Sequence, residues 1–110
     1  MHIITRKHLT EAGMQFPDAK RELAAWYKIA SKAEWRNFVE VRRTFKDTDA
    51  VDDYVIFNIR HNRYRLITII HYQRQSAKGR WAEGRVFIRS VLTHEEYNNR
   101  KNWDKGVKKK

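Results

Sequence analysis

Residues 54–72 read YVIFNIRHNRYRLITIIHY, and this stretch decides the fold. Both halves are rich in β-branched and aromatic residues, which favour strands. The polar run 60–63 between them predicts a hairpin turn, in which Asn62 tolerates the left-handed backbone conformation. We therefore expect two antiparallel strands, at 54–59 and 64–72.

Upstream of this hairpin the spacing of apolar residues changes to that of helices. Ile3 and Ile4 predict a short first strand, and three helical segments follow it. Pro17 separates the first two helices, Asp18 is the expected cap of the second, and Ser31 with Glu34 fits a capping box for the third. The side chains expected to face inward are Leu9, Ala12, Gly13 and Phe16, then Leu23, Trp26, Tyr27 and Ala30, then Trp35, Phe38, Val39, Arg42 and Phe45.

Downstream, the chain alternates between polar connections and one more strand. Residues 46–53 form a polar connection, and residues 73–84, QRQSAKGRWAEG, predict a long basic hairpin tip with two glycines. Residues 85–92 are the third strand of the meander, and the basic end of the chain, 106–110, is expected to be mobile. Helices followed by antiparallel strands predict a single α+β domain over residues 1–110.

The net charge is the most informative property of the amino-acid composition. The chain has 110 residues and a formal net charge of +11. Residues 1–59 hold 10 Lys/Arg against 9 Asp/Glu, whereas residues 60–110 hold 14 against 4, so the second half carries a net +10. An excess this localised favours a nucleic acid or the ribosome as partner, with a merely soluble basic surface as the alternative.

Several classes of protein are excluded or disfavoured by what the sequence lacks. Cysteine is absent, which excludes disulfides and thiolate zinc sites. No apolar run reaches the roughly 20 residues that span a membrane, and the start MHIITRKHL does not resemble a signal peptide. We therefore expect a cytoplasmic protein with no membrane partner.

Four residues in the basic half form the candidate site. Arg65 and Arg89 lie within strands, where a charge needs a partner or a solvated cleft, and a salt bridge to Asp52 or Asp53 is the structural alternative. Thr93 and Glu96 fit a capping box, which places His94 in the first turn of a helix and Tyr97 on the same side. Taken singly, His94 is most often a surface residue and Tyr97 a packing residue.

Together these four residues suit one reaction. Cleavage of RNA by its own 2′-hydroxyl needs proton transfer, which histidine performs near neutral pH, and cations that stabilise the phosphorane. The five histidines show no metal-ligand spacing, carboxylates are scarce in the basic half, and no glycine-rich phosphate loop is present. A mechanism without metal or cofactor remains if the protein is an enzyme.

The same residues carry a family resemblance. The runs 55–59 (VIFNI), 62–67 (N-x-YRLI) and 86–97 (VFIR-x-VLTH-x-EY), with MHII at 1–4, WY at 26–27 and SKAEW at 31–35, resemble the HigB family of toxins. The resemblance implies a RelE-like fold, ribosome-dependent mRNA cleavage, and a HigA-like helix-turn-helix antitoxin as partner. It also implies that Arg65, Arg89, His94 and Tyr97 are catalytic, with Asn62 nearby.

Two departures from the family pattern affect the predicted RNA contacts. Arg60 and His61 stand where the family usually has two glycines, so the turn geometry is expected to differ. The 73–85 hairpin is longer than usual and carries Trp81 with several cations. The predicted RNA-binding residues are Arg60, Asn62, Arg63, Arg74, Lys78 and Arg80. The competing interpretation of the whole chain is a non-catalytic basic module that binds RNA or the ribosome.

Overall fold

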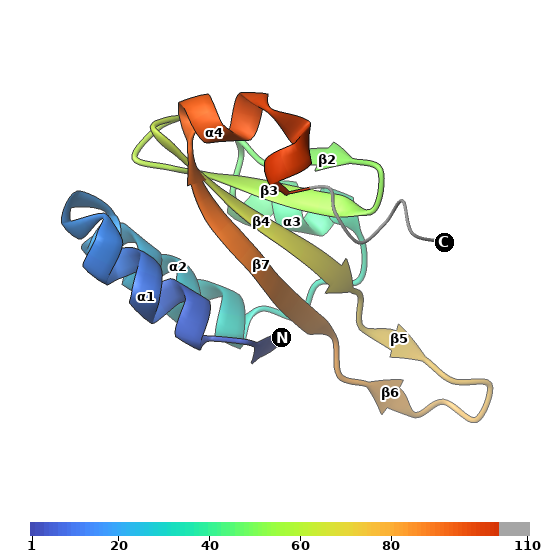
Figure 1. Ribbon diagram of the computed structural model, residues 1–110. Helices are drawn as coiled ribbons and strands as arrows, with labels where there is room; N and C mark the ends of the chain where they lie inside the picture. The colour runs from blue at the N-terminus through green and yellow to red at the C-terminus, as the bar shows by residue number, and fades with distance from the viewer. Residues whose placement is uncertain (104–110) are drawn as a thin grey trace.

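Five strands form the main sheet of the computed structural model, which describes residues 1–103 (Figure 1). In spatial order they are β1 (His2–Ile4), β7 (Arg85–Thr93), β4 (Tyr64–His71), β3 (Tyr54–Ile59) and β2 (Asp49–Val51). β2, β3, β4 and β7 are antiparallel neighbours, and β1 pairs in parallel with β7. The basic end at 106–110, expected to be mobile, lies outside the described residues.

The predicted strands are confirmed almost to the residue. β3 has the expected bounds, while β4 ends at His71 and β7 extends to Thr93. The polar connection predicted at 46–53 is wrong in part, because residues 49–51 form the edge strand β2 against β3. This segment pairs with the next strand along the chain, but it is too short and too polar to show the residue pattern of a strand.

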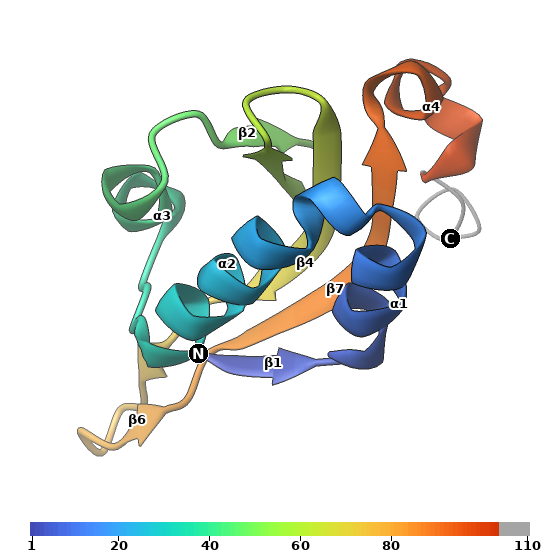
Figure 2. The same ribbon diagram turned by 90° about the vertical axis from the view of Figure 1, so that its left-hand side faces the viewer.

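Six helical segments complete the described chain. They are α1 (Lys7–Gln15), the 3₁₀ turn η1 (Pro17–Ala19), α2 (Lys20–Lys32), α3 (Phe38–Thr44), α4 (His94–Asn98) and the 3₁₀ turn η2 (Arg100–Asn102). Figure 2 shows α1 and α2 running along one face of the sheet, with α4 at the end of β7.

Two of the predicted helix caps are wrong. Asp18 lies in η1 and does not cap α2; its carboxylate instead accepts hydrogen bonds from Arg63 in the turn before β4 and from Tyr64, the first residue of β4. Ser31 does not start a helix, because α2 continues to Lys32 and the Ser31 hydroxyl donates to the carbonyl of Lys28. The third helix begins later, where the Asn37 side chain accepts from the backbone N–H of Glu40.

The turn between β3 and β4 also differs from the prediction. Arg60 and His61 have positive φ angles of 55° and 63°, whereas Asn62 was the expected left-handed residue. Two successive positive φ angles suit the right-handed twist of a hairpin, and non-glycine residues adopt them at a cost. The backbone N–H of Arg60 donates to Glu22 of α2 at 3.0 Å, which ties the turn to the helical layer.

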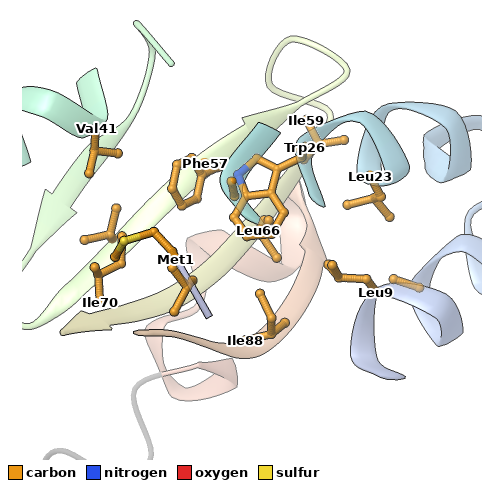
Figure 3. Close-up of a cluster of buried hydrophobic side chains, with 14 of the residues drawn as sticks. Met1, Leu9, Leu23, Trp26, Val41, Phe57, Ile59, Leu66, Ile70 and Ile88 are labelled. Atoms are coloured by element: carbon orange, nitrogen blue, oxygen red, sulfur yellow. The ribbon is translucent and has the colours of Figure 1, made fainter. Parts of the chain in front are cut away.

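The hydrophobic core lies on both faces of the sheet. On one face the side chains of α1, α2 and α3 pack against the inward residues of β3, β4 and β7, as Figure 3 shows with Trp26, Phe57 and Leu66 near the centre. On the other face a smaller cluster forms from Tyr54, Ile56, Ile67 and Trp103, with Leu92 and Tyr97 against it. This second cluster attaches α4 and η2 to the sheet.

A two-stranded ribbon extends beyond the sheet. It consists of β5 (Arg74–Gln75) and β6 (Trp81–Ala82) and projects from the end of β4 (Figure 1). Gly79, with φ 83°, closes the tip, and the backbone of Ser76 pairs with that of Arg80 at 2.7 Å. None of the helices within residues 1–103 is long and apolar enough to cross a membrane.

Candidate active site

The side chain of Arg65 joins β4 to the start of α4. It is 9% exposed, and its guanidinium donates to the carbonyl of Asn62 at 2.5 Å and to Nδ1 of His94 at 3.1 Å. A guanidinium has only donors, so Nδ1 of His94 accepts this bond.

The helix start beside this contact is firmly held. The predicted capping box is confirmed: the Thr93 hydroxyl accepts from the N–H of Glu96 at 3.1 Å, and the Glu96 carboxylate accepts from the N–H of Thr93 at 2.9 Å. The backbone N–H of His94 donates to the carbonyl of Arg63 at 2.9 Å. The cap and the cross-strand bond together fix the position from which the exposed His94 ring projects.

Tyr97 completes the cluster from the next turn of α4. The Arg65 guanidinium lies 5.2 Å from the centre of its ring, a cation–π contact. Burial raises the pKa of the Tyr97 phenol, and Asp49 raises it further against the opposing effect of Arg65 and Arg100. The phenol stays protonated at neutral pH and can donate a hydrogen bond, for example to a phosphate oxygen.

Trp103 supports this cluster and was missed at the level of sequence. Its ring stacks on Tyr97 at 5.1 Å and meets the edge of Tyr54 at 5.1 Å, and its indole N–H donates to the carbonyl of Tyr97 at 2.9 Å. It is 5% exposed. A lone tryptophan in the polar run that follows Tyr97 was the available signal that the chain returns to the sheet.

Arg89 is the predicted catalytic residue that the structure does not bring to the cluster. The β4–β7 register passes from Ile67–Ser90 to Thr68–Ile88, so Arg89 is an extra residue at a β-bulge. Its guanidinium lies 5.7 Å from the centre of the Tyr54 ring. Arg65 contacts the ring of Tyr97 and Arg89 contacts that of Tyr54, and Trp103 packs against both tyrosines.

The salt bridges considered for the two arginines do not form. Asp52 bonds with Arg100, and Arg65 uses a carbonyl and an imidazole. Within residues 1–103, neither Asp52 nor Asp53 pairs with Arg65 or Arg89. Among the described residues, no carboxylate forms a salt bridge with Arg65.

A carboxylate does anchor the neighbouring turn. Asp18 accepts from the phenol of Tyr64 at 2.6 Å and from the guanidinium of Arg63 at 2.8 Å. The Tyr64 hydrogen bond, followed by the bond to Arg63, lowers the pKa of Asp18. This contact holds the turn that supplies the Asn62 carbonyl to Arg65, and no sequence spacing marked Asp18 for that task.

The predicted RNA-binding residues fall into two groups. Arg60, Asn62 and Arg63 lie in the turn beside Arg65, with Arg63 engaged by Asp18. The other group lies on the exposed β5–β6 ribbon and comprises Arg74, Lys78 and Arg80. Arg65 is the second residue of β4 and the ribbon follows the end of this strand, so the remaining length of β4, roughly 20 Å, separates the two groups.

The comparisons with known proteins identify the family of this chain. A family model, HigB toxin, described as the RelE-like toxic component of a toxin–antitoxin system, matches residues 19–100. The chain belongs to the HigB toxin family. The resemblance seen in the sequence and the expected RelE-like α+β fold are both confirmed, and the matched range contains all four predicted catalytic positions.

Curated relatives cover almost the same length. The chain is similar to the mRNA interferase toxin HigB of Escherichia coli K12 and to the mRNA interferase HigB of Escherichia coli O157:H7 and of Shigella flexneri. Each is 28% identical over 101 residues, which is 89% of this chain and 88% of the relative. A family of toxic components implies an antitoxin as binding partner.

Proposed function

We propose that this chain is a ribosome-dependent mRNA endoribonuclease that inhibits translation, with Arg65, His94 and Tyr97 at its catalytic centre. The observation that carries the proposal is the Arg65–His94 contact at the capped start of α4, with Tyr97 against the same guanidinium. The names of the relatives as mRNA interferases support the same reaction class. A module that only bound RNA would need the arginine but not a positioned imidazole.

The reaction is cleavage of a phosphodiester by the neighbouring 2′-hydroxyl. The 2′-oxygen attacks phosphorus and loses its proton, and the bond from phosphorus to the 5′-oxygen breaks as that oxygen gains a proton. The products are a 2′,3′-cyclic phosphate and a 5′-hydroxyl. Arg65 neutralises the developing charge on the phosphorane, His94 transfers protons, and Tyr97 orients the phosphate by donating a hydrogen bond.

The hydrogen bond between Arg65 and His94 in the protein without RNA indicates how bound RNA activates His94. While Arg65 donates to Nδ1, that nitrogen cannot hold a proton, and an imidazolium would place two donors against each other. A phosphate is a stronger acceptor for the guanidinium than a neutral imidazole. When RNA draws Arg65 to its phosphate, both nitrogens of His94 become available for proton transfer.

RNA is bound on both sides of this centre in our proposal. Arg60, Asn62 and Arg63 border the cluster and contact the strand near the scissile phosphate, while Arg74, Lys78 and Arg80 on the ribbon contact RNA farther away. Trp81, 51% exposed on the same ribbon, offers a ring on which a base can stack. Arg89 contributes a further cation on the face that bears Tyr54.

The partner that restrains the toxin is, in the same proposal, a HigA-like helix-turn-helix antitoxin, and the site of action is the cytoplasm. The match to a toxin–antitoxin family supports the proposed antitoxin, and the proposed ribosomal substrate supports the cytoplasm. Coexpression of a helix-turn-helix protein encoded beside this chain should restore growth. Continued growth arrest despite a stable complex would contradict that assignment.

The experiment for the main proposal compares the same mRNA with and without ribosomes. Purified protein should cut a translated mRNA much faster in the presence of ribosomes than as free RNA, and each 3′ fragment should begin with a 5′-hydroxyl. Equal rates on free RNA would reject ribosome dependence. Ribosome binding with no cleavage would reject the enzyme and favour the basic binding module.

A further inference from the structure

A cavity lies on the face of the sheet that carries Tyr54 and Trp103. It has a volume of about 660 Å³, and the proposed catalytic residues Arg65, His94 and Tyr97 take no part in its wall. Its lining combines the bulge residues Arg89 and Ser90 with rings from α1, from β4, from β7 and from the residue that follows η2. These rings belong to His8, His71, Phe87 and Trp103.

The β-bulge aims a cation into this cavity. Ser90 pairs with Ile67 and Ile88 pairs with Thr68, so Arg89 is the extra residue of the bulge. Bulges redirect side chains in this way beside functional sites. Arg89 is exposed, makes no ion pair within residues 1–103, and rests on the Tyr54 ring. A cation held without a carboxylate is suited to an anionic ligand.

The remaining wall suits a planar ring. His71 and Phe87 lie edge to face, with their ring centres 5.0 Å apart, and Trp103 closes the side nearest the catalytic cluster. The Ser90 hydroxyl is buried and has no hydrogen-bond partner among residues 1–103, so this part of the wall holds an unsatisfied polar group. A phosphate for the guanidinium, a ring for the aromatic wall and a hydrogen-bonding group describe a nucleotide.

We infer that this cavity is a second nucleotide subsite, which holds a nucleotide flanking the scissile phosphate. Arg89 binds its phosphate, and its base packs against His71 and Phe87. The ligand class, RNA, rests on the proposed function. Arg89 is then a residue for RNA binding and register, and it does not touch the reacting atoms.

The test is binding of RNA that cannot be cleaved. Oligoribonucleotides with 2′-O-methyl riboses lack the attacking hydroxyl, and a labelled dinucleotide can be compared with longer strands by fluorescence anisotropy. The wild type should gain affinity with length. Arg89→Ala should lose roughly tenfold in affinity for the longer strands and little for the dinucleotide, because a charge-assisted hydrogen bond is lost.

Salt dependence separates the two parts of the subsite. A lost phosphate contact makes the slope of log affinity against log salt shallower by about 0.7 for single strands. Arg89→Ala should show this change, whereas His71→Ala, measured at a pH where imidazole is neutral, should lose affinity with the slope retained. Arg21→Ala removes an equal charge from exposed α2 and should change neither quantity.

Three outcomes would overturn the inference. In the first, Arg89→Ala binds RNA with the affinity and the salt slope of the wild type. In the second, the wild type gains no affinity as the RNA strand becomes longer. In the third, Arg89→Ala loses mRNA cleavage while its RNA binding is unchanged. The last would return Arg89 to the chemistry. Intact, length-dependent binding by a protein that never cleaves mRNA would reject the proposed function and leave the subsite standing.

Discussion

Replacing Trp103 by alanine removes the ring that joins α4 to the sheet. The ring is 5% exposed, packs between Tyr54 and Tyr97, and donates its N–H to the Tyr97 carbonyl. Truncating a buried tryptophan costs about 3–5 kcal/mol. Since domains of this size unfold with about 5–15 kcal/mol, the variant should lose a large part of its stability.

The measurement is urea unfolding followed by circular dichroism. Trp81→Ala is the matched control, because it removes the same side chain from a position that is 51% exposed, and it should change the free energy of unfolding by about 0.5 kcal/mol or less. Trp103→Phe keeps the stacking. It should lower the free energy of unfolding by about 1 kcal/mol for the lost hydrogen bond, in addition to the loss from its smaller ring. Equal losses in Trp103→Ala and Trp81→Ala would refute the role assigned to the second cluster.

Two other predictions concern the cap of α4 and the carboxylate of Asp18. Thr93→Ala and Asn37→Ala each remove a helix N-cap and should each lower stability by about 1 kcal/mol, but only Thr93→Ala should slow cleavage, because that cap positions His94. Thermal melts and cleavage assays check this, and equal activity in the two variants would contradict it. The pKa of Asp18 is lowered by Tyr64, so its contribution to stability is present above the unfolded value, near 3.8, and is lost as the pH falls through the lower folded value. Asp18→Asn should therefore be less stable than the wild type at neutral pH and equal to it in strong acid, and a constant difference across pH would disprove the linkage.

Short sequence motifs correctly predicted elements that are stabilised by contacts between residues close in sequence. The capping box at Thr93 and Glu96 satisfies its own orphan amides, so four consecutive residues suffice to identify it. The similar pattern at Ser31 failed because α2 continues through it and the hydroxyl has an alternative acceptor one turn back, at Lys28. Motifs of this kind decide a helix end only where the preceding element has already stopped.

Contacts between distant segments were beyond the reach of sequence spacing. Alternation placed Arg65 and Arg89 in neighbouring strands, but the skipped residue in the register, which sends Arg89 to a separate cavity, has no local signature. The parallel pairing of β1 with β7 and the return of Trp103 to Tyr54 are likewise set by packing across the whole chain. The sequence therefore placed Arg65, His94 and Tyr97 in one neighbourhood, as the structure has them, but gave no sign of the residues that support them.

The most direct test of the central claim is the cleavage rate of His94→Ala on ribosomes. His94 is exposed, so the variant should fold with a thermal midpoint close to that of the wild type. Loss of the proton-transfer group should reduce the rate of mRNA cleavage by about 10²–10⁴-fold and relieve growth arrest. A folded His94→Ala protein that cleaves mRNA at the wild-type rate would contradict the assignment of the Arg65–His94–Tyr97 cluster as the catalytic centre.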